Sequence, residues 1–261
     1  MCTLEKMGGI FLLTLTGVDE HRLNPAVIGS LRSSLRQVKD QSTRGSVLVT
    51  RNQGKFFSNG FDLEWVQSSG ASSGGSTYNQ LFNLSELFRP LVADFVSLPM
   101  PTITAVTGHA AASGMMLVSS HDYVLMRTLR SDRGYNLFIL HHHPSFFFDV
   151  GMAYPDYFTA LVREKVGSSM ARRDILLKAV KMKATEAMAV GVVDSVHESP
   201  EATVEAAVRL GEELVKRKWD GEVYSDIRLA MYPELCGVLG LAPKGVRGLA
   251  SEDLLASMAR I

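Results

Sequence analysis

The sequence predicts an α/β fold with a helical C-terminal region, and three observations carry this prediction. The chain has 261 residues, 46% of them hydrophobic, which is enough for one large domain with a sizeable core. Short apolar runs of strand length alternate with longer stretches in which apolar residues recur at helical spacing. The helical pattern dominates near the C-terminus, so we divide the chain into a core, residues 1–195, and a helical region, residues 196–261.

Strands are predicted where short apolar runs end in turn residues. They are expected at residues 10–16, 45–52, 100–108 and 122–127, with one more shortly before residue 199. We interpret the apolar run near the N-terminus as the first strand and not as a signal peptide. Glu5 stands ahead of this run, and no clear small-residue cleavage site follows it.

Helices are predicted from apolar residues on one face and from end signals. In residues 24–38, Asn24 is the expected N-cap and Pro25 takes the first helical position. The Ser/Gly-rich stretch 68–76 is predicted to be a mobile surface loop. Pro90 is expected to kink or end the first part of the helix that follows. Further helical segments are expected within residues 109–120, 154–167, 168–180, 184–190 and 201–218, and in the last 40 residues.

Charge and composition exclude several kinds of protein. Lys+Arg and Asp+Glu both number 27, so the chain lacks the basic excess typical of nucleic-acid-binding proteins. Its two cysteines, Cys2 and Cys236, are far apart, which argues against a disulfide framework and favours a reducing compartment. No apolar run approaches the roughly 18 residues of a membrane span, so none is expected.

The chain ends in Ala259-Arg260-Ile261, a small, a basic and an apolar residue. This tripeptide resembles a relaxed form of the Ser-Lys-Leu signal that the peroxisomal import receptor reads. The alternative is an ordinary frayed helix end. The first interpretation predicts a peroxisomal protein, and the second leaves the cytoplasm as the default.

Two glycine-containing turns follow predicted strands, at residues 55–63 ("KFFSNGFDL") and 107–117 ("TGHAAASGMML"). Small residues let the backbone approach a ligand closely. Two backbone N–H groups that converge at such turns can stabilise negative charge on a carbonyl oxygen, which is the task of an oxyanion hole. Glycine also serves ordinary turns, so one turn alone indicates little. Two of them, each followed by an amphipathic run, favour a binding site.

These two turns resemble those of the crotonase (enoyl-CoA hydratase/isomerase) superfamily. The family has an F-[SA]-x-G-x-D-[IL] turn and a G-x-[AC]-x-G-G-G-type turn, which match residues 57–63 and 108–114 here. The resemblance extends from about residue 10 to about residue 241, and its details are similar to the peroxisomal Δ3,Δ2-enoyl-CoA isomerases of plants. It implies a crotonase-like ββα spiral core.

The resemblance also implies roles for single residues. The N–H groups of Phe61 and Ser113 would form the oxyanion hole, although the family usually has Gly in place of Ser113. Arg22 matches a basic position near the CoA phosphates; the alternative is a solvated surface charge. Met116 replaces a glutamate of the hydratases, which argues against water addition. The other expected substrate-binding residues flank the two amides: Ser58, Asn59, Gly60, Asp62, Ala112 and Gly114. Asp62 is also expected to cap the helix after its turn.

The implied substrate is an acyl-CoA thioester, with coenzyme A as part of the substrate. The implied reaction moves a double bond between the Δ3 and Δ2 positions in unsaturated fatty-acid β-oxidation. A proton leaves carbon 2 and returns at carbon 4, through a dienolate held by the oxyanion hole. This proton transfer requires neither a metal nor a redox cofactor. The family further implies a homotrimer.

The catalytic base is the exception to this resemblance. The isomerases carry a glutamate four residues before a glycine that matches Gly151, and Phe147 stands there instead. It lies in an atypical insertion, residues 128–150. A metal site at His residues 141–143 is disfavoured, because adjacent side chains point in different directions. Asp149 is the nearest carboxylate and could replace the base after rearrangement of the loop. Alternatively, the segment is translated non-coding sequence.

The missing glutamate leaves two functions open. One is an active isomerase with a relocated base. The other is a catalytically impaired homologue that binds acyl-CoA or serves as an oligomer partner.

Overall fold

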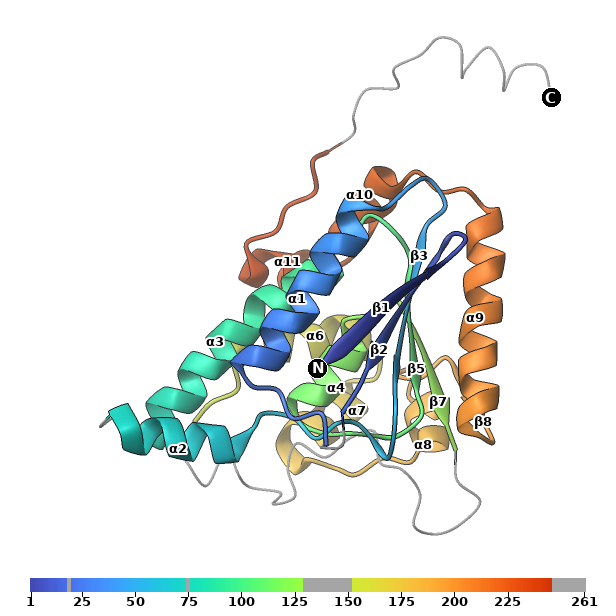
Figure 1. The fold of residues 1–261 in the computed structure, drawn as a ribbon. Helices are drawn as coiled ribbons and strands as arrows, with labels where there is room; N and C mark the ends of the chain where they lie inside the picture. Colours follow the sequence, from blue (N-terminus) through green and yellow to red (C-terminus); the bar gives the residue numbers. More distant parts are fainter. Residues whose placement is uncertain (18–19, 74–75, 129–151, 246–261) are drawn as a thin grey trace, which may run out of the picture.

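The computed structural model describes residues 1–17, 20–73, 76–128 and 152–245. A six-stranded sheet lies at its centre, with helices on both faces (Figure 1). The strands lie in the order β1 (Cys2–Met7), β2 (Ile10–Leu15), β3 (Val47–Asn52), β5 (Thr102–Val106), β7 (Tyr123–Arg127) and β8 (Ser195–His197). Neighbouring strands are parallel except for β1 and β2.

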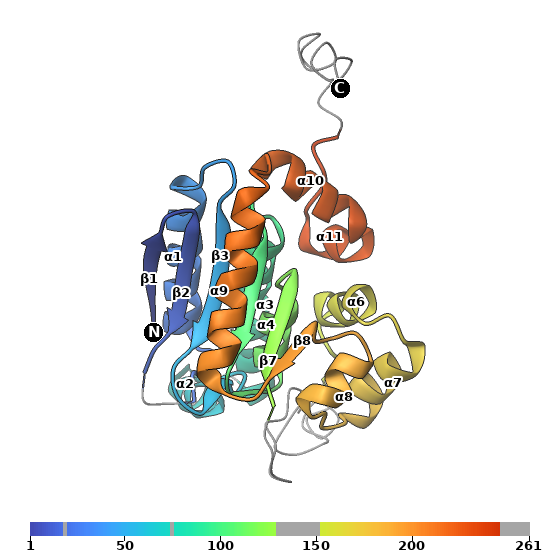
Figure 2. The same cartoon turned by 90° about the vertical axis from the view of Figure 1, so that its right-hand side faces the viewer.

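Strand β2 shows why the sheet is covered on both faces. All of its residues are buried. Ile10 and Leu12 pack in one apolar cluster with residues of α9 (Pro200–Lys216), whereas Phe11 and Leu13 belong to the larger core on the other face. Successive side chains of a strand point to opposite faces, so a wholly apolar strand needs a layer on each side. Figure 2 shows α9 lying along one face, opposite α1 (Pro25–Asp40).

A smaller sheet gives the core its repeating order. β4 (Phe56–Ser58) follows β3, and β6 (His109–Ala110) follows β5. Each short strand leads into a helix, which is α2 (Leu63–Ser73) after β4 and α4 (Ser113–Ser119) after β6. β4 and β6 pair with each other away from the main sheet. This succession of strand, strand and helix confirms the expected ββα core.

The N-terminus contains a strand that the sequence analysis missed. β1 pairs antiparallel with β2, and Met7 lies opposite Ile10, so Gly8 and Gly9 form a two-residue turn. Gly8 has φ +59°, a conformation that glycine adopts without strain. Two-residue turns of this kind join the strands of hairpins. β1 is mostly exposed and carries little apolar alternation, which explains why its pattern gave no signal.

The prediction of a surface loop at residues 68–76 is wrong for residues 68–73, because they form the end of α2. Ser and Gly are poor helix formers, but α2 packs against the long helix that follows it, α3 (Thr77–Val96). Tertiary packing therefore outweighs a weak local preference. Residues 74–75 lie outside the described residues.

Helix α3 continues through Pro90, so of the two predicted outcomes, a kink or an end, the end is wrong. A proline inside a helix costs about 3 kcal/mol, because it removes a hydrogen bond and crowds the preceding turn. The helix has a buried face on both sides of Pro90, including Leu84 and Phe88 before it and Leu91 after it. Burial of these side chains offsets the cost.

The remaining helices complete the layers around the core. Asn24 caps α1 as predicted, since it accepts a hydrogen bond from Val27 N at 3.1 Å. The other helices are α6 (Asp156–Lys165), α7 (Ser169–Lys178), α8 (Ala184–Ala189), α10 (Gly221–Met231) and α11 (Pro233–Leu239). In the described part of the chain, no helix combines the length and apolar content needed to cross a membrane.

Helix α10 is attached to the core by a buried arginine. Arg228 is 3% exposed and lies 2.5 Å from the carboxylate of Asp122. It also donates to the carbonyl oxygens of Leu98 and Met100, in the connection between α3 and β5. A buried charge is stable only with such partners. The division into a core and a helical region at residue 195 stays a prediction, although α9 covers the main sheet.

Candidate functional site

The pairing of β4 with β6 brings the two glycine turns together. Phe56 lies opposite His109, and Ser58 lies opposite Ala110, in parallel orientation. His109 N donates to the carbonyl oxygen of Lys55 at 2.9 Å. Both turns therefore leave the small sheet at the same edge, because parallel strands end side by side.

Glycine is required where the turns touch. A Cβ on Gly108 would lie 2.3 Å from the carbonyl oxygen of Lys55, and one on Gly114 would lie 2.4 Å from that of Ser58. Real Cβ atoms do not come so near to backbone oxygen. The third contact joins Gly60, at φ +81°, to Ala112: a Cβ on Gly60 would lie 2.8 Å from the Cβ of Ala112. The turns pack backbone against backbone.

Neither predicted oxyanion amide, of Phe61 or Ser113, donates to another described residue. Ser113 begins α4, and the first N–H groups of a helix have no partner within it. Phe61 forms an isolated bridge with Leu23, in which its neighbours make both hydrogen bonds. The Ser113 nitrogen lies 3.5 Å from the position that a Cβ of Gly60 would take. The two amides thus lie in touching turns and without a protein acceptor.

Backbone strain falls on Ala112, next to the amide of Ser113. Ala112 has φ +51° and ψ −124°, whereas Ser113 already belongs to α4. The family usually has Gly in place of Ser113, but the residue with the unusual backbone conformation is the one before it, Ala112. An alanine at positive φ costs about 1–3 kcal/mol, and such strain clusters at functional sites. The torsion angles of Ala112 orient the peptide group that carries the Ser113 N–H.

The segment before α1 holds the first turn in place. Asn59 N donates to Glu20 O at 2.9 Å, and Leu23 N donates to Gly60 O at 2.7 Å. The hydroxyl of Ser58 donates to the carbonyl oxygen of His21 at 2.7 Å. These bonds hold the turn on both sides of its glycine.

Asp62 caps α2 as predicted, because its Oδ1 accepts from Trp65 N at 3.0 Å. Its other oxygen accepts from the side chain of Asn24 at 3.0 Å. The carboxylate therefore links the caps of two helices. Its interaction with a substrate stays a prediction.

Arg22 forms an ion pair with Glu20 at 2.8 Å, and both side chains are about one-third exposed. Glu20 also accepts from the side-chain amide of Asn59 at 2.5 Å. Arg22 is thus neither fully solvated nor unpaired; Glu20 connects it to the first turn. Contact with CoA phosphates stays a prediction.

The side chain of Phe61 points into an aromatic cluster. Its ring packs edge-to-face on Phe88 of α3, with ring centres 5.6 Å apart, and lies 6.4 Å from the ring of Phe158 of α6. All three rings are buried. Met116, in α4, is also fully buried and apolar. The first turn therefore rests on α3 and on the beginning of α6.

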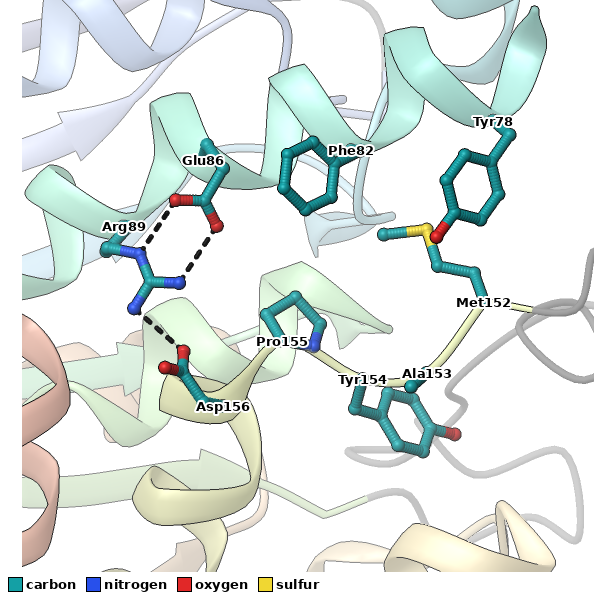
Figure 3. Close-up of a pocket in the computed structure, with 9 residues that line it drawn as sticks. All are labelled: Tyr78, Phe82, Glu86, Arg89, Met152, Ala153, Tyr154, Pro155 and Asp156. Atoms are coloured by element: carbon teal, nitrogen blue, oxygen red, sulfur yellow. Dashed lines mark hydrogen bonds and ion pairs between the residues drawn. The ribbon is translucent and has the colours of Figure 1, made fainter.

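A cavity of about 330 Å³ lies between α3 and residues 152–156, the segment before α6 (Figure 3). Its walls include Tyr78 and Phe82 of α3, and Met152 on the opposite side. The cavity was not predicted from the sequence, because nothing in the local pattern shows that these two segments meet.

Three charged side chains lie at one end of the cavity (Figure 3). Arg89 pairs with Glu86 through two hydrogen bonds, of 3.0 and 2.9 Å, and with Asp156 at 2.7 Å. The hydrogen bonds of Glu86 raise the pKa of Arg89, and the carboxylate of Asp156 acts in the same direction. Both carboxylates of the cavity are directed at this guanidinium, which makes them poor general bases.

The predicted base position, Phe147, lies outside the described residues, as do Asp149 and the histidines at 141–143. Within the described ranges, no group of three or more His, Cys, Asp or Glu side chains could hold a metal ion.

A second cluster of ionisable groups supports α4. His121 follows this helix, and burial lowers its pKa to about 4. Burial also lowers the pKa of Lys165 to about 8. Burial alone would raise the pKa of Asp122, but Arg228 and Lys165 outweigh it and hold that pKa below its ordinary value. This cluster is structural, since its members bind one another and carbonyl oxygens in the last turns of α3 and α4.

Most of the chain is similar to proteins of one family. The family model described as "Enoyl-CoA hydratase/isomerase" matches residues 5–221. Enoyl-CoA delta isomerase 2, peroxisomal, of Arabidopsis thaliana is 53% identical over 242 residues, which cover 92% of this chain and 96% of the relative. Enoyl-CoA delta isomerase 3 of the same plant is 53% identical over 255 residues, which cover 97% and 100%.

Solved structures agree on the fold. An enoyl-CoA hydratase/isomerase family protein from Pseudomonas syringae matches with a TM-score of 0.76 at 23% identity, covering 92% of this chain and 93% of that protein. A probable enoyl-CoA hydratase from Mycobacterium tuberculosis matches with a TM-score of 0.75 at 21% identity, covering 99% and 98%. At such identities the likeness shows the fold alone.

Proposed function

The chain belongs to the enoyl-CoA hydratase/isomerase family, and on that premise we propose that it moves a double bond between the Δ3 and Δ2 positions of an enoyl-CoA thioester. Two relatives that are 53% identical carry the name enoyl-CoA delta isomerase. The single observation that carries the proposal is the pair of unbonded amides, of Phe61 and Ser113, in the touching turns.

In the proposed reaction, the thioester oxygen accepts hydrogen bonds from these two amides. A proton leaves carbon 2, the electron pair spreads over the double bond and the carbonyl group, and a proton returns at carbon 4. The amides stabilise the negative charge of the dienolate. The reaction requires no metal or redox cofactor, and coenzyme A enters as part of the substrate. Met116 is apolar where a hydratase needs a second carboxylate, which favours isomerisation over hydration.

The mechanism also needs a base that removes the proton from carbon 2. Phe147 cannot accept a proton, so an active enzyme uses Asp149 in its place. The second candidate function rests on the same residue: with phenylalanine at the base position, the chain is a homologue that binds acyl-CoA without turning it over.

The test separates these outcomes. Purified protein is incubated with a 3-enoyl-CoA, and the absorbance of the conjugated 2-enoyl product is followed. Turnover that disappears in Asp149→Asn but persists in Asp156→Asn supports a relocated base. Binding without turnover supports the impaired homologue. Absence of both binding and turnover rejects the acyl-CoA assignment.

The proposal includes a homotrimer. Support comes from an apolar stripe on α10 and just before it: Trp219, Val223, Ile227 and Met231 recur every four residues and are 41–63% exposed. Ile227→Lys is expected to lower the mass measured by light scattering to that of one chain. Leu177→Lys, on α7 and equally exposed, is the control and leaves the mass unchanged.

We place the protein in peroxisomes, with the peroxisomal import receptor as its partner. Relatives that are 53% and 46% identical are named peroxisomal. The tripeptide Ala259–Arg260–Ile261 lies outside the described residues. A fluorescent fusion that keeps these residues at its C-terminus should enter peroxisomes. The same fusion without them should stay in the cytoplasm.

A further inference from the structure

The cavity beside α3 has largely apolar walls and one charged end (Figure 3). Phe82 and Tyr78 line it from α3, and Met152 and Pro155 line it from the opposite side. These side chains offer an apolar surface to a bound molecule. Glu86, Arg89 and Asp156 close one end with three charges.

The charged end carries a net negative charge, because two carboxylates face one guanidinium. Each of the three nitrogens of Arg89 already binds a partner. Its Nε and Nη2 bind Glu86, and its Nη1 lies 2.7 Å from Asp156 and donates to the carbonyl oxygen of Val238 at 3.0 Å. An incoming carboxylate would meet two like charges, at a guanidinium whose charge is already balanced by these carboxylates.

The cavity and the first turn are built on the same two elements. Phe88, next to Arg89 on α3, and Phe158, two residues after Asp156 on α6, both pack against the ring of Phe61. The amide of Phe61 is one of the two that would hold the thioester oxygen. A ligand held there therefore has an apolar cavity within the same part of the molecule.

We infer that this cavity receives the hydrocarbon end of the acyl chain, and that the Glu86–Arg89–Asp156 cluster selects uncharged chain ends against chains that end in a carboxylate. This inference rests on the proposed function and adds the class of acyl group. Burying a methylene group improves affinity about fourfold, so an apolar end gains from the walls. A terminal carboxylate loses its water and faces two like charges.

The experiment measures dissociation constants by calorimetry, with saturated thioesters that cannot react. Decanoyl-CoA is compared with its ω-carboxy analogue. The unaltered protein is expected to bind decanoyl-CoA about tenfold or more tightly than the analogue. Glu86→Gln removes one negative charge and is expected to reduce this preference about two- to fivefold, since partly exposed charges interact weakly. Glu64→Gln, an exposed change on α2, is the matched control and leaves the preference unchanged.

A second pair of variants tests the cavity independently, in case Glu86→Gln disturbs the fold. Phe82→Trp places a larger side chain in the cavity wall and is expected to lower the affinity for decanoyl-CoA more than the affinity for hexanoyl-CoA. Leu87→Trp, exposed on the same helix outside the cavity, changes neither. Equal affinities for decanoyl-CoA and its ω-carboxy analogue, or no effect of Phe82→Trp on the two chain lengths, would overturn the inference while leaving the proposed function intact. Failure of every thioester to bind would reject the proposed function itself.

Discussion

The first glycine turn and the cavity beside α3 are both built on α3 and α6, yet the paired turns are formed by backbone groups and the cavity by side chains. The turns consist of backbone: amides and carbonyl groups that touch where glycine leaves room, as at Gly108 and Gly114. The cavity consists of side chains, several of them partly exposed, such as Phe82 at 48%. A backbone site admits no added atom, whereas a side-chain site can change shape without loss of the fold. The turns therefore suit the invariant part of a substrate, and the cavity suits the variable part.

The largest loss of stability and activity is expected when one carbon atom is added where the two turns touch. In Gly108→Ala, the new Cβ would lie 2.3 Å from the carbonyl oxygen of Lys55, so the turns must separate. We expect a loss of about 3 kcal/mol in the free energy of unfolding, and loss of any isomerase activity. Gly29→Ala, in α1 with nothing within 4 Å of the new Cβ, is the control and is expected to stabilise the protein slightly. Equal denaturation midpoints for the two variants would contradict the backbone account.

The second largest effect is a loss of folding stability at low pH, through His121 in the cluster that supports α4. Burial lowers the pKa of His121 from 6.5 to about 4, so the folded state keeps this ring neutral. The unfolded chain takes up the proton first, and stability is therefore complete above about pH 6.5 and falls as the pH drops towards 4. The shift corresponds to about 3 kcal/mol.

Denaturant titrations across this pH range check the prediction. His121→Asn should remove most of the slope, whatever its effect on stability at pH 7. Asp122 and Lys165, which face this histidine, also titrate, but the pKa of Asp122 is lowered from 3.8 and that of Lys165 is about 8, so neither carries the slope between pH 6.5 and 4. An unchanged slope in the variant would assign the effect to another group.

A smaller change, a gain in the free energy of unfolding, is expected when the backbone strain at Ala112 is relieved. Ala112 has φ +51°, which glycine tolerates better than alanine. Ala112→Gly should keep the orientation of the Ser113 amide and raise the free energy of unfolding by about 1 kcal/mol. A decrease in stability would mean that the Cβ of Ala112 is needed for its contact with the opposite turn.

The smallest effect on stability is expected in the cavity. Phe82→Ala removes a half-exposed ring, so the free energy of unfolding should change by less than about 1 kcal/mol. Affinity for decanoyl-CoA should nevertheless fall, in contrast to the Leu87→Ala control. Thermal denaturation combined with calorimetry measures both quantities. A large loss of stability would show that the cavity wall is part of the core.

Local patterns predicted the parts of this protein that depend on neighbours in sequence. The strands of the main sheet other than β1, the caps at Asn24 and Asp62 and the two glycine turns follow from short-range rules of periodicity and hydrogen bonding. The short strands β4 and β6 were not predicted. The predictions failed where distant packing decides: α2 continues through its serines, and α3 continues through Pro90, because each buries a face against other helices. The β1 hairpin escaped notice because its exposed strand carries little apolar alternation.

The amino-acid order by itself determined the α/β succession and the two glycine-containing turns, since strand periodicity and turn signals act over a few residues. That only glycine fits at positions 108 and 114 was decided by the contact of each with the opposite turn. Tertiary structure alone decided that side chains from residues 78–89 and 152–156 together line a cavity with a charged end. It also decided that the strain beside Ser113 falls on Ala112. These features arise when segments far apart in the chain come into contact, and no short stretch of sequence carries that information.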